Sequence, residues 1–249
     1  MLEFHNENCT CNFQSKIKSA TIKEEPWRHL IVDDIYCQSC FQKISELLTV
    51  KKIKSDFEAV DTDHSFSQKR QNRLDDANHK KMEDIIKLRS DKHVRQFLDC
   101  AEYIYSLYPN YRKYDSIYCL PSISRMAPGV IWPVHDDSIE KSITMVIYID
   151  PEENHGTTLY SSETEFHHRV EWKPNRAHIF CPETNVTWHG YGADRDNPLT
   201  RTTIVWFAQE NPLHNKEGKL KKNQPKNDEK YWKMVFDYIT QSKCIKNFN

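Results

Sequence analysis

Seven short runs of β-favouring residues between Asp115 and Ala208 constrain the fold of this chain more than any other feature. Each run is rich in Ile, Val, Thr, Tyr or Trp, and turn-forming stretches such as PEENHG, PETN and GADRDNP separate them. Strands at this spacing predict a mainly β fold with flanking helices and a double-sheet jelly-roll core. The runs cover residues 116–124, 142–150, 156–162, 166–174, 177–182, 186–191 and 201–208.

The rest of the 249-residue chain falls on either side of this core. HLIV reads as a strand, and apolar residues recur at helical spacing in YCQSCFQKISELL, in DKHVRQFLDCAEYIYSLYP and in EKYWKMVFDYI near the C-terminus. The charged, nearly aperiodic stretch between the first two helices indicates a solvated excursion or a lid. We predict a flexible tail at 1–25, a supporting region at 26–112 with the excursion at 51–80, the core at 113–209, and a linker with a helix at 210–249.

The charge balance argues against two classes of partner. The chain has 35 Lys and Arg against 36 Asp and Glu, so that its net charge is -1. Without a basic excess, we expect neither nucleic acid nor an anionic membrane as a partner. No run approaches the length of a membrane span, and the N-terminus lacks the apolar segment of a secretory signal. We therefore expect a cytoplasmic location.

Two close cysteine pairs allow two interpretations. Cys9 with Cys11 and Cys37 with Cys40 could together form a four-thiolate zinc site that stabilises an interaction module. Against this, C-x-C is an unusual zinc motif, and the second pair lies in a pattern typical of an amphipathic helix. In the second interpretation, the protein lies in a reducing compartment and all eight cysteines are free thiols, buried or incidental. The second interpretation is the favoured one.

The segment VHDD precedes the most apolar of the seven runs and contains a candidate metal-binding pair. His135 and Asp137 are two residues apart, so in an extended chain both side chains leave the same face. His189, 52 residues after Asp137, would return beside them after three intervening strands. Two His and one carboxylate on one face of an ion describe the non-haem Fe(II) oxygenase site.

A histidine near an aspartate also arises by chance, because the chain contains 12 His. His167 and His168 face opposite ways on a predicted strand and are expected at the surface. His155 and His178 are expected to be structural. The residues around VHDD therefore decide between a metal centre and solvated polar residues at a strand end.

Arg201 and the 142–150 run favour the metal centre. Arg201 starts a strand twelve residues after His189, and a hairpin between the two strands would place its guanidinium beside that ligand, ready to bind a carboxylate. A surface ion pair is the alternative role. In the 142–150 run, the odd positions are apolar, whereas Ser142, Thr144 and Tyr148 give the even face three hydroxyls. Such a face suits a lined cavity, and a solvent-facing side is the alternative.

These residues resemble those of the Fe(II)- and 2-oxoglutarate-dependent dioxygenases, in particular the prolyl-4-hydroxylase-like branch. The similar segments include SRMAPGVIWPVHDD, SITMVIYID, VTWHGYG and LTRTTIVWF, within a resemblance from Pro26 to Ala208. It implies a double-stranded β-helix core of the cupin-like kind. The chain departs from the family at Met126 and Arg125, near which many relatives have a Tyr, and at Gly156, where relatives commonly have a Gly pair.

The resemblance implies a function and a set of site residues. His135, Asp137 and His189 would bind Fe(II), Arg201 would hold the distal carboxylate of 2-oxoglutarate, and Tyr148, with Thr144 beside it, would support that cosubstrate. The expected activity is hydroxylation of a C–H bond, with succinate as coproduct and ascorbate as reductant. The expected substrate is a small molecule or a peptide, with an amino-acid or prolyl side chain as the leading candidate.

Two other functions stay open at this point. A cupin-like protein could bind a metal or a small acid in the same barrel without oxygenase turnover, although Arg201 has no role in a mere metal sensor. An AlkB-type oxidative demethylase is the other alternative, because Arg195 and Arg201 reproduce the six-residue Arg spacing of that group. Against it, Arg195 follows His189 too closely, and the chain is not basic.

Overall fold

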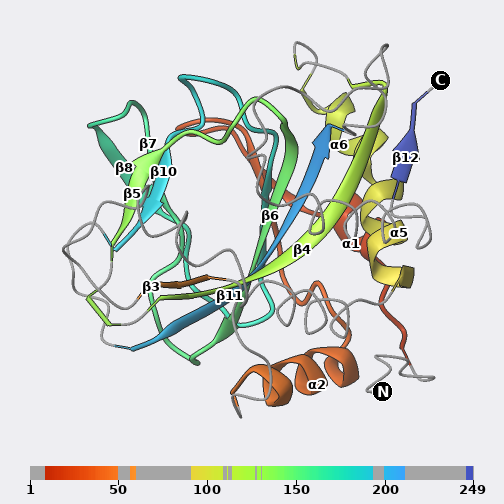
Figure 1. Cartoon of the computed structure of the whole chain (residues 1–249), viewed down its shortest axis with the longest axis horizontal. Helices are drawn as coiled ribbons and strands as arrows, with labels where there is room; N and C mark the ends of the chain where they lie inside the picture. The colour runs from red at the N-terminus through yellow and green to blue at the C-terminus, as the bar shows by residue number, and fades with distance from the viewer. Residues whose placement is uncertain are drawn as a thin grey trace, which may run out of the picture.

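Two antiparallel sheets and a layer of helices make up the described part of the chain (Figure 1). The computed structural model describes residues 9–49, 57–59, 91–108, 111, 114–126, 128–129, 131–192, 199–210 and 245–248. In Figure 1, the smaller sheet lies at the left, the larger sheet runs through the middle, and helices α1, α5 and α6 lie beyond it at the right. The predicted mainly β fold with flanking helices is confirmed.

The larger sheet contains eight strands and the smaller sheet four. The order across the larger sheet is β1 (Thr21–Lys23), β2 (His29–Val32), β9 (Ala177–Phe180), β6 (Lys141–Asp150), β11 (Arg201–Glu210), β4 (Ser116–Met126) and β12 (Ile245–Asn247), and β3 (Phe57–Ala59) pairs with β4 in parallel. The order across the smaller sheet is β5 (Trp132–His135), β10 (His189–Tyr191), β7 (Thr158–Tyr160) and β8 (Phe166–Arg169).

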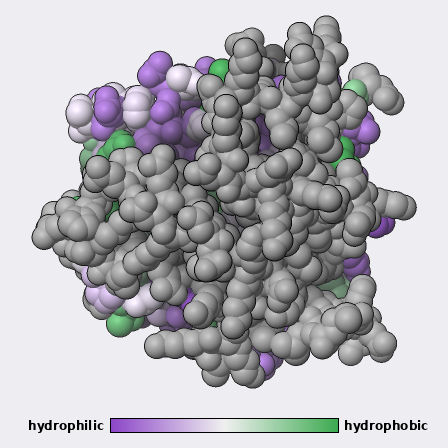
Figure 2. All heavy atoms as spheres, viewed as in Figure 1, coloured by the Kyte–Doolittle hydropathy of each residue, from purple (hydrophilic) through white to green (hydrophobic). Residues whose placement is uncertain are grey.

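The order of these strands is that of a jelly roll. From β4 to β11 the chain passes back and forth between the sheets, so that β9, β6, β11 and β4 lie in one layer and β8, β7, β10 and β5 in the other. This is the double-stranded β-helix expected from the sequence. In Figure 2, most of the described atoms at the upper left, where Figure 1 shows the smaller sheet, are hydrophilic.

Strand β6 separates two hydrophobic clusters. Its odd residues, such as Ile143 and Ile147, pack in the larger cluster together with the helices, and each contributes about 1.5–3 kcal/mol by burial. Val146 and Tyr148, from the even face, pack in a smaller cluster with residues of the smaller sheet, such as Leu159. The even face of β6 is buried, so the solvent-facing alternative is wrong, whereas the cavity lining stays a prediction.

Among the described residues, four helices cover the outer face of the larger sheet or lie at its edge: α1 (Phe13–Lys18), α2 (Gln38–Thr49), α5 (Asp91–Asp99) and α6 (Ala101–Ser106). The single helix predicted over 91–108 is divided at Cys100, whose N–H donates to the Phe97 carbonyl at 3.0 Å, in a tighter turn than an α-helix makes. Among the described helices, none combines the length and the apolar character needed to cross a bilayer.

The predicted flexible tail at 1–25 is wrong from residue 9 onward. Asn12 caps α1 by accepting a hydrogen bond from the Ser15 N–H at 3.0 Å, and Phe13 and Ile17, one turn apart, are fully buried. Strand β1 then pairs with β2. The spacing of these two apolar residues was the overlooked signal, because it places both on one helix face.

Two other predicted regions lie mostly outside the described residues. Within the excursion at 51–80, the structure describes only the three residues of β3, which extend the sheet rather than stand apart from it. Of the linker and helix at 210–249, it describes Glu210 and residues 245–248, and Ile245–Asn247 pairs with β4. The predicted helix EKYWKMVFDYI lies outside the described residues.

Candidate metal centre

Strands β5 and β10 bring His135, Asp137 and His189 together. His189 is the direct partner of His135 in the antiparallel register of the two strands, and their ring centroids are 4.3 Å apart. Asp137 follows β5 by two residues, and its Oδ1 lies 3.9 Å from Nε2 of His135. One potential ligand atom from each of the three side chains lies within 4.8 Å of the other two. Three residues far apart in sequence thus form one group.

Backbone carbonyls set the orientation of both imidazoles. Nδ1 of His135 bonds to the Pro133 carbonyl at 2.8 Å, and Nδ1 of His189 bonds to the Thr187 carbonyl at 2.8 Å. A carbonyl oxygen only accepts, so each Nδ1 carries the proton and each Nε2 is left unprotonated, with a lone pair that can accept a hydrogen bond or bind a metal. Trp132 Nε1 donates to Nε2 of His135 at 3.3 Å, which agrees with this assignment. Both rings are held in the tautomer that ligates through Nε2.

Asp137 is buried and held by two side chains. The Thr144 hydroxyl donates to its Oδ2 at 2.7 Å, and the Lys141 ammonium contacts its Oδ1. Burial by itself would raise the pKa of Asp137, but the nearby charge of Lys141, the interaction with His189 and these two hydrogen bonds lower the pKa to about 2. The carboxylate is therefore ionised at neutral pH, as a metal ligand must be.

Burial also keeps His189 in its ligating form. Desolvation lowers the pKa of His189 to about 4, although the Asp137 carboxylate opposes the shift. The imidazole is therefore neutral at pH 7. His135 is the accessible member of the group, because its side chain is 32% exposed whereas that of Asp137 is 2% exposed. A ligand or substrate can reach the group from the side of His135.

This donor set fits a divalent iron ion. Two neutral imidazoles and one carboxylate, all from one side, are the ligands of non-haem Fe(II) sites, and they leave other coordination positions for small molecules. A structural zinc site, by contrast, is closed by four protein ligands. The three residues are therefore suited to an ion that takes part in chemistry.

Arg201 lies at the start of β11, buried between aromatic rings. Its Cζ is 4.1 Å from the centroid of the Tyr191 ring, 5.6 Å from that of Tyr148 and 5.7 Å from that of Trp172. The residue is only 6% exposed, and its Nε has no hydrogen-bond partner among the described residues. No carboxylate among the described residues forms an ion pair with Arg201. Burial lowers the pKa of Arg201, but a guanidinium stays charged at neutral pH.

A buried cation without a counter-charge is costly unless an anion is bound beside it. The aromatic rings offset part of this cost by cation–π attraction, which amounts to about 2 kcal/mol for a desolvated pair. Because Tyr191 belongs to β10 and Arg201 to β11, their contact joins the two sheets across the interior. Arg201 is suited to bind a carboxylate in the layer that also holds the metal ligands.

Tyr148 supports the wall of this interior layer. Its ring stacks on Trp172 with centroids 4.6 Å apart, and its hydroxyl donates to Thr157 Oγ1 at 3.1 Å and accepts from the Thr157 N–H at 2.9 Å. Gly156 makes this packing possible, since a Cβ there would lie 1.9 Å from the Val170 carbonyl oxygen and 3.0 Å from the Tyr148 hydroxyl. Because the Tyr148 hydroxyl already donates its hydrogen bond to Thr157, it can only accept a hydrogen bond from any further partner.

His178, which the sequence analysis interprets as a structural residue, is a polar residue of this layer. It lies opposite Val146 in the register of β6 and β9, is fully buried, and has no hydrogen-bond partner for either ring nitrogen among the described residues. Its ring packs 5.1 Å from Phe180, which in turn packs 5.0 Å from His189. Burial lowers the pKa of His178 well below its ordinary value, so it is neutral. It can offer a donor and an acceptor to a polar ligand.

Several predicted details of the site differ in the structure. The hairpin expected between the strands of His189 and Arg201 is wrong, because β10 and β11 belong to different sheets and face each other across the interior. Four strands, β6 to β9, separate Asp137 from His189, where three were expected. Thr144 donates its hydroxyl hydrogen bond to Asp137, and its predicted role toward a cosubstrate stays a prediction. Arg195 lies outside the described residues.

Other residues around the site had weaker signals or none in the sequence. Tyr191 lies two residues after His189 on the same strand, and this spacing could have identified it as a neighbour on the same face. Lys141 lies four residues after Asp137 and is a neighbour in sequence, whereas Trp172 had no such signal, since only the folded chain brings it to Arg201.

Comparisons with known proteins gave matches only among solved structures. No family model and no curated protein matches the chain. A prolyl-4-hydroxylase from Pseudomonas putida is 9% identical, with 80% of this chain and 90% of that chain covered and a TM-score of 0.42. A prolyl 4-hydroxylase from Phytophthora capsici is 14% identical, with 86% and 68% covered and a TM-score of 0.42.

A third similar structure is an oxidoreductase of the 2OG-Fe(II) oxygenase family from Burkholderia pseudomallei. It is 12% identical, with 73% of this chain and 84% of that chain covered and a TM-score of 0.41. Similarity at this level does not identify a reaction or a substrate.

Proposed function

We propose that this protein is a non-haem Fe(II) oxygenase that uses 2-oxoglutarate as cosubstrate. The observation that carries the proposal is the group of His135, Asp137 and His189, in which both imidazoles present an unprotonated Nε2 and the carboxylate is ionised. Bound together, Fe(II) and 2-oxoglutarate would let dioxygen convert a substrate C–H bond to C–OH while the oxoacid becomes succinate and carbon dioxide.

In this proposal, the chain's own residues bind the iron ion, orient its ligands and enclose the cosubstrate. The Pro133 and Thr187 carbonyls fix the two imidazoles, and Thr144 and Lys141 fix Asp137, so that the three ligands are held before the ion arrives. Preorganisation of this kind limits the rearrangement that binding requires. The exposed edge of His135 leaves a route for substrate.

Arg201 is the proposed anchor for the distal carboxylate of 2-oxoglutarate. A guanidinium can form two parallel charge-assisted hydrogen bonds with a carboxylate. The anion would also supply the counter-charge that no described residue gives Arg201. The stacked rings of Tyr148 and Trp172 enclose the guanidinium and keep water away from it. The Tyr148 hydroxyl donates its hydrogen bond to Thr157, so it can only accept one from a further partner. Tyr148 therefore lines the site and does not donate a hydrogen bond to the carboxylate.

The experiment that tests this function is succinate release. Purified protein with Fe(II), ascorbate and 2-oxoglutarate should form succinate slowly without substrate and consume dioxygen in proportion. Arg201→Met should weaken 2-oxoglutarate binding and leave iron binding intact. Arg176→Met is the matched control, because Arg176 already pairs with Asp33 and Glu171. If Arg201→Met binds 2-oxoglutarate as the wild type does, the proposed anchor is wrong. If no succinate forms under any condition, a binding protein without turnover replaces the oxygenase.

The proposed substrate class is an amino-acid side chain, free or in a peptide, with a prolyl side chain first. This part rests on the resemblance of the sequence motifs alone. Screening proline-containing and other peptides for accelerated succinate release should identify an activating substrate. Stimulation only by nucleic acid would instead favour the demethylase alternative.

A further inference from the structure

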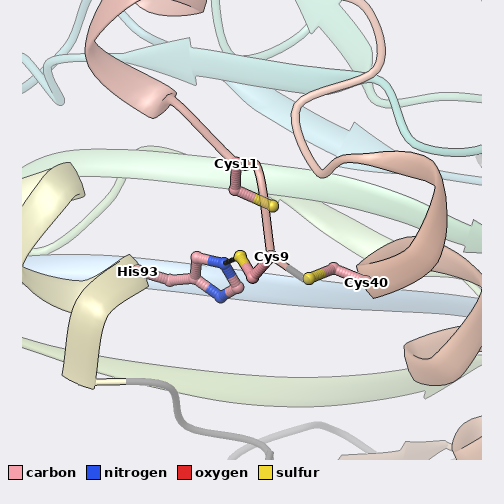
Figure 3. A group of neighbouring side chains, drawn as sticks. All are labelled: Cys9, Cys11, Cys40 and His93. Atoms are coloured by element: carbon pink, nitrogen blue, oxygen red, sulfur yellow. Dashed lines mark hydrogen bonds between the residues drawn. The ribbon is translucent and has the colours of Figure 1, made fainter. Parts of the chain in front are cut away.

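A second group of metal-ligating side chains lies on the helical side of the larger sheet. Cys9, Cys11, Cys40 and His93 each place one ligand atom within 4.8 Å of the other three. Figure 3 shows the four side chains pointing toward one another, with Cys40 projecting from α2 and His93 from α5. Cys11, Cys40 and His93 are buried, and Cys9 is half-buried.

Three separate segments supply these four residues. Cys9 and Cys11 are two residues apart in the non-helical segment that precedes α1, Cys40 lies in α2, and His93 lies in the first turn of α5. The thiol of Cys9 already contacts Nε2 of His93 at 3.2 Å, the dashed line in Figure 3. The group thus joins parts of the chain that are up to 84 residues apart.

Hydrogen bonds from α5 hold the N-terminal segment in place. The Lys92 ammonium donates to the Cys9 carbonyl at 3.0 Å, and Gln96 Nε2 donates to the Cys11 carbonyl at 3.0 Å. Gln96 also accepts from the Phe13 N–H at 3.2 Å, and the Phe13 ring stacks on His93 with centroids 5.3 Å apart. Residues on one face of α5 therefore fix the backbone on both sides of Cys11 and fix the imidazole plane.

The sulfur of Cys11 is placed as a thiolate ligand would be. The Cys37 N–H donates to Cys11 Sγ at 3.1 Å. Backbone N–H groups that point at sulfur stabilise a metal-bound thiolate, as such outer partners do for ligands in general. The structure assigns every described cysteine as a free thiol. None of the described sulfurs is therefore engaged in a disulfide.

We propose that Cys9, Cys11, Cys40 and His93 bind one zinc ion with a structural role. Three thiolates and one imidazole are a ligand set that zinc binds tetrahedrally, and four protein ligands leave no open position. With Zn–S bonds of about 2.3 Å, tetrahedral geometry puts neighbouring sulfurs about 3.8 Å apart. The four ligand atoms lie within 4.8 Å of one another, so side-chain movements of only about 1 Å would bring them to the tetrahedral distances.

The ligand set differs from the four-thiolate site considered from the sequence. His93 takes the place of Cys37, whose Sγ lies 3.4 Å from the Ser39 hydroxyl and which contributes its backbone N–H instead. His93 had no signal in the sequence, because it lies 53 residues after Cys40 and inside a helical pattern. A zinc ion here would tie the N-terminal segment, α2 and α5 together against the larger sheet.

Metal analysis of the full-length protein, purified from medium that contains both zinc and iron, tests the proposal. About one zinc per chain should copurify, and zinc affinity should fall by at least about 100-fold in Cys40→Ser and in His93→Gln. Cys37→Ser and Cys100→Ser are the matched controls, since each removes a thiol outside the proposed ligand set and should keep the zinc.

The wild-type protein supplies a second measurement in case a ligand variant does not fold. X-ray absorption at the zinc edge should give three sulfur ligands and one nitrogen ligand, and a thiol-blocking mercurial should release the zinc. The proposal is overturned if no zinc copurifies, if the ion has no sulfur ligands, if four sulfurs bind it and Cys37→Ser removes it, or if iron occupies the thiolates. None of these outcomes depends on oxygenase activity.

Discussion

The two groups of metal ligands lie on opposite faces of the larger sheet and differ in what they leave open. His135, Asp137 and His189 face the layer between the sheets, supply three ligands and include one half-exposed imidazole. The cysteine group lies among the helices, supplies four ligands and is mostly buried. Ligand number separates a centre that can bind reactants from one that only holds the chain together.

The two groups also differ in how the fold assembles them. In the first, strand pairing places His135 opposite His189, so the jelly roll itself creates the site. In the second, side-chain hydrogen bonds and helix packing bring together an N-terminal segment and two helices. We therefore expect loss of the first group to abolish chemistry and loss of the second to reduce stability.

The largest expected effect is that of removing a ligand of the first group. His189→Ala should lose Fe(II) binding and reduce succinate formation by at least about 100-fold, since two remaining ligands hold the ion poorly. Iron content and succinate release are the measurements. His167→Ala, which removes an exposed imidazole from the smaller sheet, is the control and should keep both. Equal loss in the control would mean that the effect is not specific to the site.

Removal of zinc should act on stability. If the site is filled at about 100 times its dissociation constant, its loss lowers the free energy of unfolding by about 2.7 kcal/mol. Thermal unfolding of Cys40→Ser against Cys37→Ser measures this difference. Any Cys40→Ser protein that stays folded should still bind Fe(II). If it unfolds at the wild-type temperature, the cysteine group has no structural role.

Arg201 tests the link between the first group and its cosubstrate. Arg201→Met should raise the Kd for 2-oxoglutarate by about 10- to 100-fold, the equivalent of a charge-assisted bond of about 1.5–3 kcal/mol. Binding isotherms at saturating Fe(II) in the absence of dioxygen give the value. Fe(II) affinity should be unchanged, and Arg176→Met should behave as the wild type.

Thr144 should have the smallest effect of the four. Thr144→Val keeps the shape of the side chain but removes the hydroxyl that donates to Asp137 Oδ2. Outer partners of metal ligands contribute about 10- to 100-fold in metal affinity, and the Lys141 contact remains, so we expect the lower end, about 10-fold. Ser142→Ala, on the same strand face, is the control. An unchanged Fe(II) affinity would show that Lys141 alone positions Asp137.

Local patterns in the sequence were enough to predict much of the first group. The i, i+2 spacing of His135 and Asp137 predicts both side chains on one face, and the succession of β-rich runs predicts that the chain returns His189 to them, although the number of intervening strands was wrong. The register that makes His135 and His189 partners depends on contacts across the sheet. The prediction that β10 and β11 form a hairpin beside Arg201 was wrong, because no local feature of the sequence shows whether a loop stays in one sheet or crosses to the other.

The second group shows where sequence patterns are insufficient. Cys9, Cys11 and Cys40 were candidates from their spacing, yet the fourth residue, His93, is brought in only by the packing of α5 against the N-terminal segment. The segment itself was expected to be a tail, although Phe13 and Ile17 have helical spacing. Tertiary contacts, which no short window of sequence contains, decided both points.

Anaerobic titration with Fe(II) and 2-oxoglutarate, followed by visible absorption, tests the central claim most directly. The account predicts the absorption band of an iron–oxoacid chelate, saturating at one iron per chain in the wild type, weakened at low 2-oxoglutarate in Arg201→Met and absent in His189→Ala. The contrary result is a band of full strength in His189→Ala, or no band in wild-type protein that binds iron.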